Sequence, residues 1–96
     1  MSRAIIFDVD GTLSETEETH RRAFNRAFEQ AGLAWRWDQA LYERLLAVTG
    51  GKERIRYFID DFDAAGVPPG DVDAFIRSLH AAKTIAYTDM VSGGEV

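Results

Sequence analysis

Residues 4–13 read Ala-Ile-Ile-Phe-Asp-Val-Asp-Gly-Thr-Leu, and this stretch decides which fold the chain is expected to adopt. Its first four residues are apolar and two of them are β-branched, which predicts a short buried strand. Gly11 predicts a tight turn directly after two aspartates. Because strand side chains alternate with a period of two residues, Asp8 and Asp10 are expected to point the same way. Carboxylates so close repel each other, and a bound divalent cation would relieve the repulsion.

Two other interpretations of this stretch follow from the residues. A strand followed by Asp-Gly is also a common start of a hairpin, in which case the aspartates form an ordinary turn. A helix-loop-helix calcium loop also uses alternating aspartates and a glycine. With Gly11 at the sixth loop position, however, the first ligand position falls on Ile6, which has no side-chain oxygen.

A helix is predicted directly after this turn. Ser14 and Glu17 have the spacing of a capping box, in which Ser14 caps the helix and Glu17 reaches back to it. Apolar residues then recur at helical spacing up to Gly32, the expected stop. Glu17 and His20 therefore lie on the first turns of a helix that leaves the aspartate turn, and they are expected to face what the aspartates face. Each also has a structural interpretation, as a cap partner and as the end of an apolar stripe.

A second helix is predicted after a segment that contains two tryptophans. Asp38 is a suitable cap, and apolar residues continue at helical spacing through about Val48. Trp35 and Trp37 could stack on a ligand, but tryptophans in such a position more commonly anchor a core. We therefore expect both to pack in the interior.

The segment Thr49–Arg54, with the sequence Thr-Gly-Gly-Lys-Glu-Arg, predicts an anion site. Gly50 and Gly51 end one helix and open another, so free backbone amides are expected to point outward beside Lys52 and Arg54. The segment lacks the upstream glycine and the Ser or Thr after the lysine that a P-loop needs, so nucleotide binding is not indicated. The alternative is an ordinary connection between two helices.

Two further helices complete the predicted pattern. After Gly66–Gly70, which is the clearest break in the chain, Asp71 is expected to cap the last helix. Lys83 falls on the apolar stripe of that helix, where it either extends over the core or braces the end that carries the site. The helix before the break is expected to bury Ile55, Phe58, Ile59 and Phe62.

Composition excludes several classes of partner. The 96 residues carry a net charge of −5, which argues against nucleic acid or an anionic membrane as the partner. There is no cysteine, so disulfide and thiol chemistry are excluded. No apolar run near the start is long enough for a signal peptide or a membrane span, and the cytoplasm is the expected location.

These motifs resemble the haloacid dehalogenase superfamily of phosphotransferases. The string DVDGTL after a hydrophobic strand is similar to the first motif of that superfamily. The rest resembles its CbbY type of sugar-phosphate phosphatase, which is related to β-phosphoglucomutases. The segments that carry the resemblance are FDVDGTLSETEETHRRAFN (residues 7–25), TGGKERI (49–55) and HAAKT (80–84).

The resemblance implies an α/β fold with a HAD-like Rossmannoid core and an α-helical cap. The residues present are then mainly α, with one strand and a four-helix cap. Residues 1–14 would form the first strand and aspartate loop of an incomplete core, residues 15–92 the cap, and residues 93–96 the start of the linker back to the core. The family's Ser/Thr, lysine and acidic motifs are absent, so we expect an amino-terminal fragment that is inactive alone, and a full-length protein that is monomeric.

The function that the resemblance implies is Mg²⁺-dependent removal of phosphate from a sugar bisphosphate through an aspartyl-phosphate. Asp8 would be the nucleophile and Asp10 the general acid and base, with both residues at the magnesium site. The CbbY resemblance implies a pentulose bisphosphate such as xylulose 1,5-bisphosphate, an inhibitor of Rubisco, and so a link to the Calvin cycle. The residues expected to bind the substrate are Asp8, Asp10, Glu17, His20, Gly50, Gly51, Lys52, Glu53 and Arg54.

Two alternative functions stay open. A mutase of the β-phosphoglucomutase kind shares the cap and the aspartate pair, and it differs in passing the phosphoryl group to a second sugar hydroxyl rather than to water. The other alternative is a non-catalytic helical interaction module.

Overall fold

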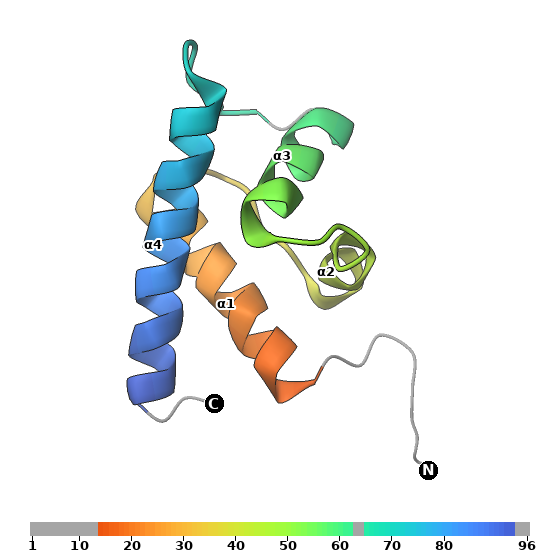
Figure 1. The fold of residues 1–96 in the computed structure, drawn as a ribbon, viewed down its shortest axis with the longest axis vertical. Coiled ribbons are helices and arrows are strands. Elements are labelled where there is room, and N and C mark those ends of the chain that lie inside the picture. Colours follow the sequence, from red (N-terminus) through yellow and green to blue (C-terminus); the bar gives the residue numbers. More distant parts are fainter. Residues whose placement is uncertain (1–13, 63–64, 94–96) are drawn as a thin grey trace.

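The computed structural model describes residues 14–62 and 65–93 (Figure 1). This part of the chain contains four helices: α1 (Glu15–Gln30), α2 (Gln39–Leu45), α3 (Gly51–Asp61) and α4 (Val72–Ser92). It contains no strand, and the predicted strand and aspartate turn lie outside it. The expected mainly helical character is therefore confirmed for the described residues.

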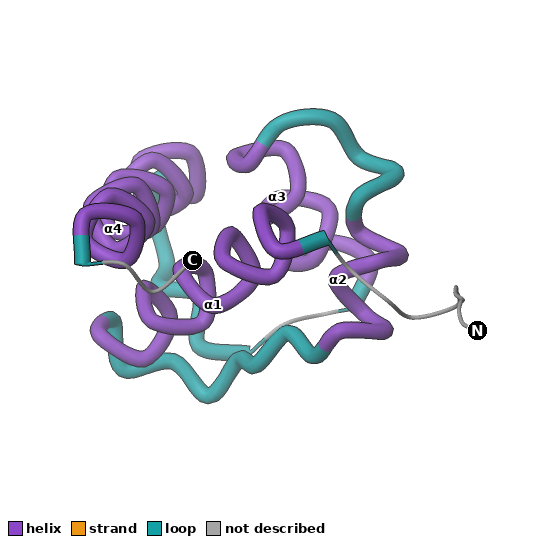
Figure 2. Tube along the Cα trace, turned by 90° about the horizontal axis from the view of Figure 1, so that it is seen from below, coloured by secondary structure: helices purple, strands orange, loops and turns teal. Residues whose placement is uncertain are grey.

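The longest helix, α4, lies along α1, while α3 packs against α4 and α2 packs against α1 (Figures 1 and 2). The contact between α1 and α4 includes the small buried residues Ala23 and Ala86, together with Met90. Small side chains at a crossing let two helix axes approach closely. This pairing brings the first turns of α1 beside the middle of α4.

The first helix begins as the capping pattern predicts. The Ser14 hydroxyl accepts a hydrogen bond from the Glu17 amide at 3.1 Å, and it lies 3.5 Å from a carboxylate oxygen of Glu17. The helix ends at Gln30, and Gly32 follows with a φ angle of +78°, which favours glycine.

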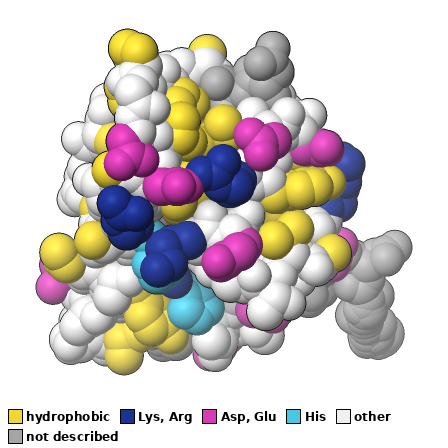
Figure 3. Space-filling view, turned by 45° about the horizontal axis from the view of Figure 1, so that its top comes forward, with side chains coloured by type: hydrophobic (Ala, Val, Ile, Leu, Met, Phe, Trp, Pro, Cys, Tyr) yellow, Lys and Arg dark blue, Asp and Glu magenta, His cyan; other side chains and the backbone are white. Residues whose placement is uncertain are grey.

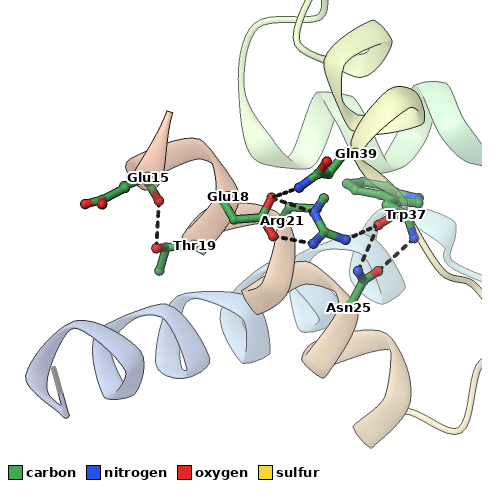
Figure 4. Close-up of polar contacts among 7 residues, drawn as sticks. All are labelled: Glu15, Glu18, Thr19, Arg21, Asn25, Trp37 and Gln39. Carbon is green, nitrogen blue, oxygen red and sulfur yellow. Dashed lines mark hydrogen bonds and ion pairs between the residues drawn. The ribbon is translucent and has the colours of Figure 1, made fainter. Parts of the chain in front are cut away.

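A polar network holds the connection between α1 and α2 against α1 (Figure 4). The Asn25 side chain donates to the Trp37 carbonyl at 2.9 Å and accepts from the Trp37 amide at 2.8 Å. Arg21 donates to the same carbonyl and forms an ion pair with Glu18, which also accepts from Gln39. The hydrogen bond from Arg21 holds the pKa of Glu18 below its ordinary value. This network fixes the backbone from which Trp37 enters the core.

The core is rich in aromatic side chains. Trp37 is fully buried and packs on Phe24, Phe28 and Phe58, with ring centroids 4.8 to 5.4 Å away. Trp35 is partly buried against the same cluster, and its indole N–H donates to the Ala65 carbonyl. The prediction that both tryptophans serve packing is confirmed.

Two details of the predicted helices are wrong. Helix α2 ends at Leu45 rather than near Val48, because Ala47 and Val48 donate to carbonyls three residues back, which tightens the chain into turns. Phe62 is 37% exposed rather than buried, because α3 has ended one residue earlier. Its ring stacks on Phe58 at the edge of the core.

None of the helices in the described part of the chain is both long and apolar enough to span a membrane.

Candidate functional site

A pocket of about 390 Å³ lies where the start of α1, the start of α3 and the middle of α4 meet. Each helix contributes polar side chains to its wall, and α2 closes one side. The lining residues are Thr16, Glu17, His20, Tyr42, Leu46, Gly51, Arg54, His80 and Lys83.

Lys83 is the buried cation of this pocket. Its side chain comes from α4, and the residue is only 9% exposed. The ammonium nitrogen lies 4.8 Å from the centroid of the Phe24 ring and 5.3 Å from that of Tyr87, so aromatic faces surround it. Burial lowers the pKa of Lys83, and the nearby Arg54 guanidinium lowers it further. The two roles predicted for Lys83 were extension over the core and bracing of the site, and the structure is compatible with both, because its ammonium group lies over the core ring of Phe24 and also lines the pocket.

His20 is held by Lys83 and by Tyr87. Its Nδ1 atom lies 3.0 Å from the Lys83 ammonium, and its ring stacks on Tyr87 with centroids 4.2 Å apart. Because an ammonium group only donates hydrogen bonds, Nδ1 is the acceptor and the ring proton lies on Nε2. Burial lowers the pKa of His20, and Lys83 lowers it further. A neutral imidazole that offers an N–H at Nε2 is the form favoured near neutral pH.

Arg54 is fixed at the opposite wall. Its Nε donates to the Leu45 carbonyl at 3.2 Å, and its guanidinium carbon lies 5.8 Å from the Tyr42 ring centroid. Burial raises the pKa of the Tyr42 hydroxyl, against the opposing effect of Arg54. Tyr42 therefore stays a neutral hydroxyl at the edge of the pocket.

His80 contacts the first residue of α3. A Cβ atom at Gly51 would lie 2.6 Å from both Cδ2 and Nε2 of the His80 ring, so the ring occupies the space above the glycine. Burial lowers the pKa of His80, and Lys83 and Lys52 lower it further. The His80 side chain of α4 thus packs against the first residue of α3.

The charges in this pocket suit a polar anion that carries hydroxyl groups. Arg54 and Lys83 are cationic, His20 and His80 supply N–H donors, and Glu17 lines the same pocket. A carboxylate such as Glu17 accepts from hydroxyls, while the cations and imidazoles bind an anion such as phosphate. This arrangement is suited to binding and orienting such a ligand, and the carboxylates predicted to react, Asp8 and Asp10, lie outside the described residues.

The structure brings together only part of the predicted substrate site. Glu17, His20, Gly51 and Arg54 line the pocket together. Gly50 is the N-cap of α3, with a φ angle of +96°, and does not line it. Three residues on a helix are nearly one turn, which is why Gly51 and Arg54 share a face.

Lys52 and Glu53 lie on another face of α3. They line a separate hollow of about 250 Å³ together with the ion pair of Arg56 and Asp73 and with Arg77. Figure 3 shows a face of the molecule on which basic and acidic side chains alternate beside histidine. Residues of the segment Thr49–Arg54 therefore line two separate hollows rather than one.

Five pocket residues were not among the predicted site residues, namely Thr16, Tyr42, Leu46, His80 and Lys83. His80 lies three residues before Lys83, and this spacing was the available signal that both share a face of α4. In the sequence, Tyr42 and Leu46 fit the apolar stripe of a helix, and Thr16 fits the first turn of a capped helix. No local pattern distinguishes them from core and surface residues.

Comparison with known proteins identifies the class of protein. The family described as Haloacid dehalogenase-like hydrolase matches residues 5–92. The chain belongs to this family.

Within the family the chain is similar to CbbY proteins, as the sequence predicted. It is 47% identical to Protein CbbY of Rhodobacter capsulatus over 94 residues. This alignment covers 98% of this chain and 39% of the relative. It is also 47% identical over 95 residues to the plasmid Protein CbbY of Cupriavidus necator, covering 96% of this chain and 36% of the relative. The chain thus spans less than half the length of these relatives.

Solved structures show the same relationship. CbbY from Rhodobacter sphaeroides in complex with phosphate aligns with a TM-score of 0.71 and 43% identity, over 88% of this chain and 35% of that one. A mutant of that protein in complex with xylulose 1,5-bisphosphate aligns with a TM-score of 0.67 and 42% identity, over 86% of this chain and 35% of that one.

Proposed function

We propose that this chain, within a protein of its relatives' full length, forms part of a Mg²⁺-dependent phosphatase that acts on a sugar bisphosphate. The observation that carries the proposal is the pocket in which Lys83, Arg54 and His20 meet Glu17 at the start of α1. Asp10 precedes Ser14 by four residues, so the two lie at most about 14 Å apart along the chain. This length of chain allows the predicted reacting carboxylates to approach a pocket suited to a sugar and an anion.

The proposed chemistry is phosphoryl transfer to Asp8. Its carboxylate oxygen attacks phosphorus, the bond to the sugar oxygen breaks, and Asp10 gives its proton to that oxygen. Water then attacks the aspartyl-phosphate while Asp10 takes up a proton, which releases phosphate and restores Asp8. Asp10 must be protonated for the first step, and a neighbouring carboxylate raises the pKa of such a group.

Carboxylates such as Asp8 and Asp10 are ligands that Mg²⁺ prefers. The residues that the structure describes contain no group of three or more His, Cys, Asp or Glu side chains that could hold a metal ion. When bound, the ion would offset the charge of the transferred phosphoryl group.

In this proposal the pocket receives the part of the substrate that is not cleaved. Arg54, Lys83 and the Nε2–H group of His20 bind the second phosphate, and Glu17 accepts hydrogen bonds from sugar hydroxyls. The complex of a similar CbbY protein with xylulose 1,5-bisphosphate supports a pentulose bisphosphate as the substrate class. The partner is thus a small sugar phosphate.

The test compares three substrates with the full-length protein. We expect xylulose 1,5-bisphosphate to be hydrolysed with a kcat/KM at least about a hundredfold above that of the better of xylulose 1-phosphate and xylulose 5-phosphate, each of which carries one phosphate and so lacks either the phosphate to be cleaved or the second anion for the pocket. Analysis of the products by NMR identifies free phosphate if the enzyme is a phosphatase. An isomerised sugar bisphosphate with no phosphate release, or an equal rate on either monophosphate, would contradict the proposal.

A further inference from the structure

Gly51 lies at a junction of three helices. A Cβ atom at this position would lie 2.6 Å from the His80 ring of α4 and 3.4 Å from the Phe24 ring of α1. The first of these distances is too short for any side chain, so the absence of a Cβ lets the His80 ring lie directly on the start of α3. The His80 ring therefore fills the space that a side chain at position 51 would need.

Position 51 requires glycine because there is no room for a Cβ atom, and not because of its backbone conformation. Gly32, Gly50, Gly66 and Gly70 have positive φ angles, which favour glycine whatever surrounds them. Gly51 has no such angle and occupies the first position of a helix, where alanine is a favourable residue. Without His80, alanine at position 51 would be accommodated.

The same contact joins two helices that both carry pocket residues. Arg54 follows Gly51 by one helical turn on the same face, and Lys83 follows His80 by one turn on α4. A change in the spacing at Gly51 and His80 therefore moves Arg54 relative to Lys83. Both cations face the same pocket, so their separation decides which anion fits between them.

We propose that His80 is a positioning residue, seated on Gly51, that sets the separation of the α3 and α4 walls and thereby the affinity of the pocket for the uncleaved phosphate. This proposal rests on the proposed function for its substrate. It assigns His80 no contact with the reacting atoms. It predicts that residues 51 and 80 act as one unit.

The experiment is a double-mutant cycle in the full-length protein with Gly51→Ala, His80→Ala and the double variant. We expect Gly51→Ala to raise KM for xylulose 1,5-bisphosphate about tenfold, with kcat changed less than about twofold. His80→Ala should also raise KM, and the double variant should equal His80→Ala alone because the methyl group occupies the vacated space. Ser78→Ala, an exposed position on α4, is the matched control, and its effect should multiply with that of Gly51→Ala.

Two results would overturn the proposal. One is a double variant whose KM is the product of the two single effects. The other is a loss of stability without a change in KM, which would make the contact structural only. If Gly51→Ala fails to fold, a folded double variant supports the proposal and an unfolded one overturns it.

A separate readout distinguishes failure of this proposal from failure of the proposed function. If the unsubstituted protein does not hydrolyse the bisphosphate, the same cycle is measured as affinity for inorganic phosphate, followed by NMR of the amide of residue 51. Equal affinities for the double variant and His80→Ala then support the role of His80, whereas multiplied effects overturn it.

Discussion

At the scale of single residues, the pocket depends on a cation that the fold holds out of water. Lys83 lies among aromatic rings, and its contact with His20 joins positions 63 residues apart. The helical spacing placed Lys83 on an apolar stripe, and the contact itself was not predictable. Which residue of α1 meets it depends on how α1 and α4 cross, and this is a property of the packed helices rather than of local sequence.

We predict that Lys83→Met weakens anion binding without lowering stability at pH 7. The affinity of the full-length protein for inorganic phosphate should fall roughly tenfold to a hundredfold, because a charged hydrogen-bond donor is lost. The free energy of unfolding should stay equal or rise, because a buried ammonium group is costly to desolvate and methionine is not. Phosphate titration and urea denaturation measure the two effects.

The matched control for Lys83→Met is Arg77→Met, an α4 cation that lines the other hollow. It should leave phosphate affinity within about twofold. Equal losses of affinity in both variants would show that the pocket has no special role.

The histidines predict a pH dependence of stability. Burial lowers the pKa of both His20 and His80 below the ordinary value of 6.5, so the unfolded chain binds protons more readily. Stability should therefore be full above about pH 7 and fall as the pH drops through 6.5. Urea denaturation at a series of pH values measures this, and the fall should be smaller for a variant with both histidines replaced by glutamine. Stability that rises between pH 7 and pH 5.5 would contradict the assignment.

At the scale of elements, the starts of helices were predictable and some ends were not. Ser14, Asp38 and Asp71 each accept a hydrogen bond from an amide three residues on, as short polar caps do. These signals are local. Where α2 ends and whether Phe62 is buried both depend on how the following segment packs. The apolar pattern alone therefore predicted a longer α2 and a buried Phe62.

The connection between α1 and α2 provides a prediction at this scale. Asn25→Ala should destabilise the chain by about 2 kcal/mol, because it removes two hydrogen bonds to the Trp37 backbone and leaves those groups without that partner. Urea denaturation measures the change. Gln30→Ala, at an exposed position of the same helix, is the control and should change stability by less than about 0.5 kcal/mol. A similar loss in both variants would contradict a special role for the network.

At the scale of the whole molecule, the pocket and the predicted reacting residues come from different parts of the chain. The aspartate motif predicted the family, which the comparisons confirm. The described helices form a pocket that Arg54 and Lys83 line, and its ligand, like the roles of Asp8 and Asp10, stays a prediction. Sequence patterns indicated the family more readily than the pocket, because a motif is contiguous and a pocket is assembled from four helices.

We predict that residues 1–96 alone release no phosphate from xylulose 1,5-bisphosphate above the background rate, although their helices fold. The expected Ser/Thr, lysine and acidic motifs are absent from this sequence, so the groups that would complete the site are missing. A phosphate-release assay with and without Mg²⁺, together with circular dichroism, tests this. Magnesium-dependent release by the 96-residue chain would contradict it.

The most direct test of the proposed function is acid-quenched mass spectrometry of the full-length protein during turnover of xylulose 1,5-bisphosphate. We predict that a phosphoryl group is found on Asp8, and that Asp8→Asn abolishes both this adduct and phosphate release, while Asp60→Asn, an exposed change on α3, retains both. Continued phosphate release by Asp8→Asn, or a phosphoryl group on another residue, would contradict it.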